Sequence, residues 1–217
     1  MGRIRGRNNR AVKINHDTFD FWTRNNAWVL GLLTADGSIG GKARPQEFKL
    51  YSTDLELLEA VKSVFQSEKK IYVNQGVKGR LGKKPVGSLF ISSNKMMNFF
   101  REINAVGNKD IRNPFPFIPD EYKWSFIKGL FDGDGNGYKG HFAIAGRELL
   151  IEQVYHWICR QIGKKPNKLY KSTSTNKTVY FQMGKADSAI VLAFIEKEAA
   201  GTYSSEKYKR FGEILAA

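Results

Sequence analysis

"FIKGLFDGDGNGY", residues 126–138, contains an apolar run that leads directly into two aspartates and closely spaced glycines. The apolar spacing predicts a helix that ends near Asp134. The C-terminus of a helix carries a partial negative charge, so Asp132 and Asp134 lie where an anion is unfavourable. We therefore expect a compensating positive charge beside them.

An earlier copy of this stretch makes the chain an internal repeat. In "WVLGLLTADGSIG", residues 28–40, Gly31 aligns with Gly129 and Asp36 with Asp134, each pair 98 residues apart. Either copy alone is typical of an ordinary turn rich in Asp and Gly. Two copies, each after a helix and before a strand, instead favour a shared function.

The segments that follow the two copies agree in their order. Periodicity predicts helices mixed with antiparallel strands in each half, which is an α+β fold. In the first half the later elements include those predicted at 47–52, 53–65, 70–75, 88–93 and 94–103. In the second half they are predicted at 140–145, 147–162, 167–172, 178–183 and 186–199, with a last helix from Ser204. The sequence therefore predicts two pseudo-symmetric α-β-β-α-β-β-α half-domains.

Three prolines mark the connection between the halves. Pro114, Pro116 and Pro119 cannot lie inside a helix or a central strand, so this segment is predicted to be a semi-rigid linker. The predicted division of the chain is a basic N-terminal arm at 1–18, a first half-domain at 19–103, a linker at 104–120 and a second half-domain at 121–217.

Small residues line one face of each repeated helix. They recur every fourth residue, at Ala27, Gly31, Ala35, Ser125, Gly129 and Gly133. Such a stripe lets two helix backbones approach closely, because no large side chain holds them apart. We predict that the two helices pack side by side across the pseudo-two-fold, with Ala27, Gly31, Ser125 and Gly129 at the interface. If the helices run parallel, Asp36 and Asp134 emerge together.

A divalent cation would resolve the repulsion between two carboxylates at two helix C-termini. Mg²⁺ is the oxygen-liganded choice beside phosphate. A calcium-binding EF-hand is excluded, although Asp132, Asp134 and Asn136 have the spacing with which such a loop begins. That loop needs a glutamate as its twelfth residue, and Ala143 holds this position.

The overall charge points to a polyanionic partner. The chain of 217 residues has 35 Lys and Arg against 21 Asp and Glu, a net charge of +14, which favours nucleic acid. The single cysteine, Cys159, excludes internal disulfides and thiolate metal cages, and the three histidines have no zinc-ligand spacing. The chain contains no apolar run of about 18 residues, so the sequence predicts no membrane-spanning helix. The basic N-terminus lacks the apolar core of a secretory signal, so we expect an intracellular protein of the cytoplasm, nucleoid or an organelle matrix, not a secreted one.

These residues together resemble the LAGLIDADG homing endonucleases in their single-chain, two-motif form. The nine-residue motif is similar to Val29–Gly37 and Ile127–Gly135, and the segments 50–61 and 106–135 also look like family sequence. The resemblance implies a DNA-binding saddle of two antiparallel sheets along the major groove, backed by helices, with the motif helices at the centre. It also implies a monomer that hydrolyses both strands of a long double-stranded DNA target with a divalent metal, leaves 3′ overhangs, and serves intron homing.

The resemblance further implies which residues form the active site. The last acid of each motif, Asp36 and Asp134, would bind the metal together with the carbonyl groups of Ala35 and Gly133. The metal would be Mg²⁺, with Mn²⁺ or Ca²⁺ able to substitute in binding. A basic residue would lie near each scissile phosphate, and the matching positions in this chain are Lys109 and Lys207, with Lys209 as a rival to Lys207.

One position departs from the family pattern. Thr34 stands where the first motif usually has an acid, whereas Asp132 keeps that acid in the second motif. Because the metal-binding acid is the later one, the change is expected to alter local capping more than catalysis. It makes the two half-sites unequal.

Strand alternation sorts the expected DNA contacts. Phe48 and Leu50 would pack under the helices and leave Lys49 and Tyr51 on the DNA face. The same reasoning selects Tyr72, Asn74, Tyr180 and Gln182. Amide side chains suit adenine edges, whereas lysine reads guanine or meets phosphate. The loops at 76–87 and 171–177 add the basic candidates Lys78, Arg80, Lys83, Lys84, Lys171 and Lys177, and the arm adds Arg3, Arg5, Arg7 and Arg10.

Two other functions fit the same scaffold. One is an RNA-splicing maturase that holds an intron RNA, and the other is a noncatalytic DNA-binding regulator. The two retained acids argue against both, since a regulator gains nothing from repulsive carboxylates. The sequence leaves open the target site, the number of metals and the genetic element that encodes the chain.

Overall fold

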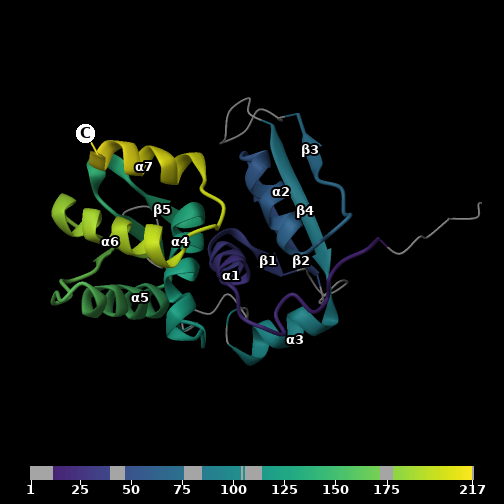
Figure 1. The fold of residues 1–217 in the computed structure, drawn as a ribbon, viewed down its shortest axis with the longest axis horizontal. Coiled ribbons are helices and arrows are strands. Elements are labelled where there is room, and N and C mark those ends of the chain that lie inside the picture. The colour runs from purple at the N-terminus through teal and green to yellow at the C-terminus, as the bar shows by residue number, and fades with distance from the viewer. Residues whose placement is uncertain are drawn as a thin grey trace, which may run out of the picture.

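A computed structural model describes residues 12–39, 47–75, 85–103, 105, 114–171 and 178–216. The described residues form two halves, one on each side of a central pair of helices (Figure 1). The first half contains α1 (Arg24–Asp36), β1 (Ser38–Ile39), β2 (Glu47–Ser52), α2 (Leu55–Val64), β3 (Tyr72–Asn74), β4 (Val86–Ser92) and α3 (Asn94–Glu102).

The second half repeats this order and adds one helix. It contains α4 (Lys123–Asp134), β5 (Gly135–Asn136), β6 (Ala143–Gly146), α5 (Glu148–Gln161), β7 (Tyr170–Lys171), β8 (Val179–Gln182), α6 (Lys185–Glu198) and α7 (Glu206–Ala216). Two short 3-10 helices, η1 (Asp120–Tyr122) and η2 (Tyr138–Gly140), lie before and after α4. The predicted α-β-β-α-β-β-α order is therefore confirmed in both halves.

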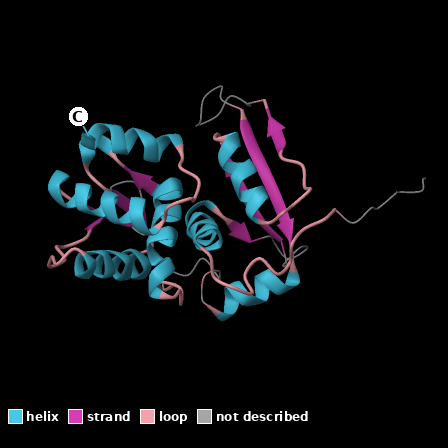
Figure 2. Ribbon diagram, in the orientation of Figure 1, coloured by secondary structure: helices cyan, strands magenta, loops and turns pink. Residues whose placement is uncertain are grey.

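Each half contains a four-stranded antiparallel sheet (Figure 2). The strand orders are β1-β2-β4-β3 and β5-β6-β8-β7, so the two sheets have the same topology. The edge strands β1 and β5 begin within two residues of the ends of α1 and α4. Both sheets therefore start at the C-termini of the central helices and extend outward from them.

Local sequence explains where the first-half helices begin. The Thr23 hydroxyl accepts a hydrogen bond from the Asn26 amide at 3.1 Å, and the Asn26 side chain accepts one from the Thr23 amide at 2.9 Å. This reciprocal capping box fixes the start of α1. Asp54 and Ser93 cap α2 and α3 in the usual way, each accepting a hydrogen bond from the backbone three residues on.

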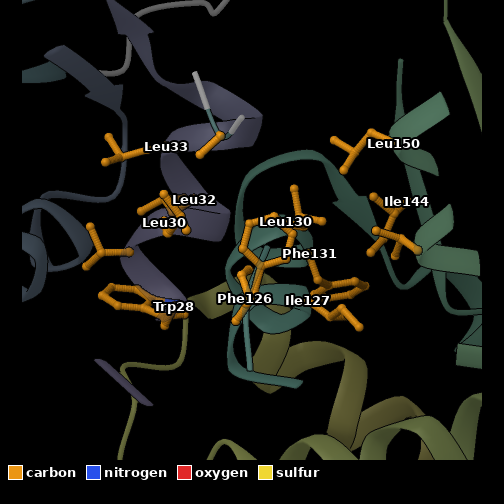
Figure 3. Close-up of a cluster of buried hydrophobic side chains, with 14 of the residues drawn as sticks. Trp28, Leu30, Leu32, Leu33, Phe126, Ile127, Leu130, Phe131, Ile144 and Leu150 are labelled. Carbon is orange, nitrogen blue, oxygen red and sulfur yellow. The ribbon is translucent and has the colours of Figure 1, made fainter. Parts of the chain in front are cut away.

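The central helices are buried all round, as their near-continuous apolar sequence requires. Residues 26–33 of α1 and 124–132 of α4 are all buried. Figure 3 shows their apolar side chains, among them Trp28, Leu30, Phe126 and Leu130, gathered around the helix pair. The prediction that the motif helices pack at the centre of the fold is confirmed.

The ends of the predicted segments lie partly outside the described residues. Residues 114–119 of the predicted linker form neither helix nor strand. The described part of the predicted arm is attached to the first half, because the Asn15 amide donates to the Phe65 carbonyl at 2.9 Å and the Glu68 amide to the Lys13 carbonyl at 3.0 Å. The arginines at 3, 5, 7 and 10 lie outside the described residues. In the described ranges, no helix has both the length and the apolar character needed to cross a bilayer.

Candidate functional site

The two motif helices run parallel and touch backbone to backbone. A Cβ atom built on Gly31 would lie 2.0 Å from the Phe126 carbonyl oxygen, and one built on Gly129 would lie 2.0 Å from the Trp28 carbonyl oxygen. One turn further on, a Cβ on Gly133 would lie 2.5 Å from the Ala35 Cβ. The contacts advance together along both chains, so both C-termini emerge side by side. Ala27 and Ser125 are wholly buried on the same two helices.

This packing brings Asp36 and Asp134, the last residues of α1 and α4, to one place. A Cβ on Gly133, the residue before Asp134, would lie 3.1 Å from the Asp36 Oδ2 atom. Gly37 and Gly135 follow the two acids in extended conformation and lead into the first strand of each sheet. The acid pair therefore lies where the two helix ends and the inner edges of the two sheets meet.

Partial burial raises the pKa of both carboxyl groups, although each keeps an exposed edge. The pKa of Asp134 rises to about 6, first through loss of water and second through the negative charge of Asp36, while the Lys207 ammonium opposes the rise. Burial also raises the pKa of Asp36 against the same opposing charge. The pair therefore binds protons more tightly than free aspartates and provides a site for a cation.

Lys207 is the basic residue at this site. Its ammonium donates to the Gly133 carbonyl at 2.5 Å and to the Phe131 carbonyl at 3.3 Å, and so caps the end of α4. Burial lowers the pKa of Lys207, opposed by the charges of Asp36, Asp132 and Asp134.

The structure separates Lys207 from its rival. Lys209 is exposed and pairs with Glu206 at 2.7 Å, and this hydrogen bond raises the pKa of Lys209. The structure therefore brings Lys207, and not Lys209, to the acids. Lys109, the predicted equivalent in the first half, lies outside the described residues.

The site fits a cation that takes only some of its ligands from the protein and the others from bound molecules. Within the described ranges, His, Cys, Asp and Glu side chains nowhere gather in threes as a metal-binding group. Asp36 and Asp134 supply two carboxylates, and the Gly133 carbonyl beside them already accepts from a positive group, Lys207. Two carboxylates with the remaining positions left for water and phosphate match the usual surroundings of Mg²⁺.

Asp132 has a different role from Asp134, which the sequence did not reveal. It is buried between the helices and accepts hydrogen bonds from the Trp28 indole at 2.8 Å and from the Ser205 hydroxyl. Thr34, the aligned residue, instead donates back to the Leu30 carbonyl of its own helix at 2.7 Å. Asp132 is therefore a buried acceptor that joins three segments. The two copies of the repeat differ at both positions: Thr34 aligns with Asp132, and Phe126 aligns with Trp28. This difference was a sequence signal for the hydrogen bond between Trp28 and Asp132.

The first sheet presents the predicted side chains on the face away from its helices. Phe48 and Leu50 are buried, whereas Lys49 is partly exposed and Tyr51 is exposed. Phe90, which the sequence analysis missed, lies opposite Lys49 in the register of β2 and β4. Its ring centroid lies 6.2 Å from that of Tyr51 and 6.0 Å from that of Tyr72, and the Lys49 ammonium lies 5.4 Å from it.

The outer strands are more open than simple alternation predicts. β3 is an edge strand, and all three of its residues, Tyr72, Val73 and Asn74, are exposed. In the second half Val179 and Phe181 are buried, whereas Tyr180 is partly open and Gln182 exposed. The Tyr180 ring stacks on Tyr170 at 5.3 Å, next to the exposed Lys171. Of the other predicted phosphate contacts, Lys78, Arg80, Lys83, Lys84 and Lys177 lie outside the described residues.

Comparison with known proteins gives a domain match over part of the chain and fold matches over most of it. Residues 24–104 match the model of the LAGLIDADG-like domain. A DNA polymerase of Thermococcus sp. (strain GE8) is 28% identical over 131 residues, a match that covers 58% of this chain and 7% of the polymerase. This chain therefore spans only a small part of that protein.

Three solved structures share the architecture over most of this chain. The I-LtrWI LAGLIDADG homing endonuclease bound to target DNA is 14% identical, with 89% of this chain and 90% of that chain covered and a TM-score of 0.57. I-DmoI in complex with DNA and Ca is 18% identical, with coverage of 94% and 100% and a TM-score of 0.54. Full-length DUF199/WhiA from Thermatoga maritima is 15% identical, with coverage of 93% and 64% and a TM-score of 0.54.

Identities this low establish the fold and not the activity, whereas the domain match rests on the sequence itself. Together they confirm the resemblance that the two motifs predict. Residues 24–104 of this chain match the LAGLIDADG-like domain, and its two halves together have the fold of the LAGLIDADG homing endonucleases.

Proposed function

We propose that this chain is a site-specific, metal-dependent DNA endonuclease that hydrolyses both strands of a long target and leaves 3′ overhangs. The observation that carries this proposal is the meeting of Asp36 and Asp134 at two joined helix ends, beside the Lys207 ammonium. A protein that only binds DNA gains nothing from two carboxylates where phosphates must approach. Because one chain supplies both acids, we propose that it acts as a monomer.

A divalent cation would be held by Asp36 and Asp134, with the carbonyl group of Ala35 as a further ligand. The Gly133 carbonyl, which the motif also suggests as a ligand, accepts a hydrogen bond from the Lys207 ammonium in this structure. When bound, Mg²⁺, or Mn²⁺ in its place, would act as a Lewis acid on the phosphate and lower the pKa of an attacking water. Structures of I-DmoI with target DNA and Ca, Mg or Mn support a divalent metal in this fold. Lys207 would contribute a fixed positive charge that stabilises the charge developing on the phosphate.

The sheets provide the surface on which DNA would lie. Both begin at the acid pair and expose polar and aromatic side chains on the face away from their helices. The net charge of +14 supplies attraction to a phosphate backbone. I-LtrWI and I-DmoI, which have this fold, were both solved in complex with DNA, and this supports double-stranded DNA as the partner here.

A noncatalytic DNA-binding protein is the second candidate. The observation that favours it is the fold match to DUF199/WhiA, a protein whose name does not describe a nuclease. The fold alone therefore does not require cleavage, and the acid pair is the feature that distinguishes the two functions.

Selection from a randomised duplex library tests the proposal. The chain is incubated with the library in the presence and absence of Mg²⁺, and the cut ends and the bound fraction are sequenced. We expect Mg²⁺-dependent ends that share one long sequence and carry 3′ overhangs. Enrichment of bound DNA without cut ends would support the noncatalytic candidate, and selective binding of intron RNA in a parallel assay would support a maturase.

Substitution of the acids tests the assignment of the site. Asp36→Asn or Asp134→Asn is expected to abolish cleavage and to leave DNA binding largely intact. Asp120→Asn is the matched control, because Asp120 is an exposed acid just before the opposite end of α4, where it pairs with Lys123 at 2.5 Å. Cleavage at the rate of the unsubstituted chain by both Asp36→Asn and Asp134→Asn would overturn the assignment.

A further inference from the structure

The connection between α6 and α7 crosses from one half of the molecule to the other. In Figure 1 it runs from the second half toward α1 before α7 begins. The Tyr203 hydroxyl lies 3.2 Å from both carboxylate oxygens of Asp54, the residue that caps α2 in the first half. The Tyr203 ring also contacts Trp28 of α1, with centroids 5.9 Å apart. The connection is thus attached to the first half at Tyr203.

Two residues later, the connection is attached to α4 by a buried hydrogen bond. The Ser205 hydroxyl donates to Asp132 Oδ1, and both residues are buried. The same hydroxyl accepts from the Tyr208 amide at 3.2 Å, which makes Ser205 the N-cap of α7. Asp132 is held in turn by the Trp28 indole at 2.8 Å and by the Lys128 ammonium at 3.4 Å.

Lys207 follows two residues after this cap. A lysine has a long, flexible stem, so the position of its ammonium depends on where its backbone is held. Because Ser205 fixes the first turn of α7 against α4, the Lys207 stem spans only the short path to the Gly133 carbonyl. Lys209, on the same turn, pairs with Glu206 in solvent.

We propose that Ser205 and Asp132 are positioning residues, which hold the start of α7 against α4 and thereby fix the Lys207 ammonium at the Gly133 carbonyl, beside the two acids of the cleavage site. The catalytic part of this statement rests on the function proposed above. The geometric part does not, since it concerns only where Lys207 lies.

The arrangement belongs to the second half. The residue aligned with Asp132 is Thr34, whose hydroxyl is used within α1, and the residue aligned with Trp28 is Phe126, which has no polar atom to donate. Within the described part of the first half, these aligned positions therefore form no such link. The two cleavage sites differ in how their surroundings are held.

Crystal structures of two serine variants test the geometric part. Ser205→Ala removes the hydroxyl that joins α7 to Asp132. Ser188→Ala is the matched control, because Ser188 is also wholly buried in the second half and hydrogen-bonded, to the Phe142 amide and the Met183 carbonyl. We expect Lys207 to leave hydrogen-bond distance of the Gly133 carbonyl in Ser205→Ala and to stay in Ser188→Ala. An unmoved Lys207 in Ser205→Ala would overturn the proposal.

Ser205→Gly separates the link to Asp132 from helix capping. Glycine is nearly as good an N-cap as serine, so this variant keeps the start of α7 while removing the hydroxyl. It is expected to displace Lys207 as Ser205→Ala does, and it serves as the test if Ser205→Ala does not fold.

Cleavage kinetics test the catalytic part. In Ser205→Ala, displacement of the Lys207 ammonium from the site is expected to lower kcat for DNA cleavage by about tenfold, with KM and DNA affinity unchanged. In a Lys207→Met background, Ser205→Ala should have no further effect on kcat, because the ammonium that Ser205 positions is already absent. Independent effects that multiply would show that Ser205 does not act through Lys207. If the unsubstituted chain cleaves no DNA, the proposed nuclease fails, while the crystal structures still decide the position of Lys207.

Discussion

At the scale of single residues, the ionised acid pair destabilises the folded chain in the absence of metal. The pKa of Asp134 is about 6 in the folded chain, above its ordinary value of 3.8, because of burial and the charge of Asp36. Below pH 4 the group is protonated in both folded and unfolded states and does not affect stability. Between pH 4 and 6 the unfolded chain loses this proton first, so folding becomes less favourable as the pH rises.

This predicts that Asp134→Asn is more stable than the unsubstituted chain at pH 8 without metal. Allowing for solvent screening of a partly exposed group, the gain should be about 1 kcal/mol, or about 2–4 °C in Tm. Thermal unfolding followed by circular dichroism measures it, and the gain should vanish near pH 4. Added Mg²⁺ should raise the Tm of the unsubstituted chain, because a ligand of the folded state stabilises it. Equal melting temperatures at pH 8 would contradict this prediction.

Asp120 provides a control of opposite sign at the same scale. The hydrogen bond and the charge of Lys123 lower the pKa of Asp120, so its ionised form favours folding above the ordinary pKa. Asp120→Asn should therefore not raise the Tm at pH 8. A rise equal to that of Asp134→Asn would show that removing any negative charge is stabilising, independent of the site.

At the scale of elements, the contact between α1 and α4 depends on two glycines. Each lies against the backbone of the opposite helix, so any side chain would force the helices apart. Glycine within a helix destabilises it by up to about 1 kcal/mol relative to alanine. At both positions the close approach of the helices, which brings the acids together, offsets this cost.

Gly31→Ala is predicted to lower the free energy of unfolding by about 3 kcal/mol or more, since its methyl group would overlap the Phe126 carbonyl. Gly129→Ala should behave alike, because its surroundings are related by the pseudo-two-fold. Gly212→Ala in α7 is the control, where the nearest atom is 3.9 Å from the added carbon. It should be neutral or stabilising by up to about 1 kcal/mol in urea unfolding. A similar loss in all three variants would argue against a specific role for the helix contact.

At the scale of the whole molecule, two equivalent folds present unequal surfaces. The first sheet exposes the aromatic cluster of Tyr51, Tyr72 and Phe90 beside Lys49, whereas the second exposes Gln182 and the stacked pair of Tyr170 and Tyr180. Unequal surfaces on a pseudo-two-fold frame are suited to a target whose two halves differ in sequence.

The net positive charge predicts that DNA affinity falls steeply with salt. Lys171→Ala should reduce the slope of log K against log salt concentration by about one unit, if this exposed lysine meets a phosphate. Lys197→Ala is the control, because Lys197 lies on α6, outside either sheet, and pairs with Glu198 at 3.0 Å. Fluorescence anisotropy over a salt series measures both slopes. An equal change in the two variants would show that Lys171 acts only through the net charge.

The amino-acid sequence was enough to predict the two halves, the central helix pair and the acids at its end, because these follow from local periodicity, from small residues at fixed spacing and from a repeat of 98 residues. The folded arrangement was needed to show that Lys207 and not Lys209 lies beside the acids, that Asp132 is a buried acceptor, and that Phe90 joins the aromatic cluster of the first sheet. Each of these depends on contacts between segments far apart in the chain, such as Lys207 with Gly133. The angle and depth at which packed elements meet fix such contacts, and no local sequence pattern encodes them.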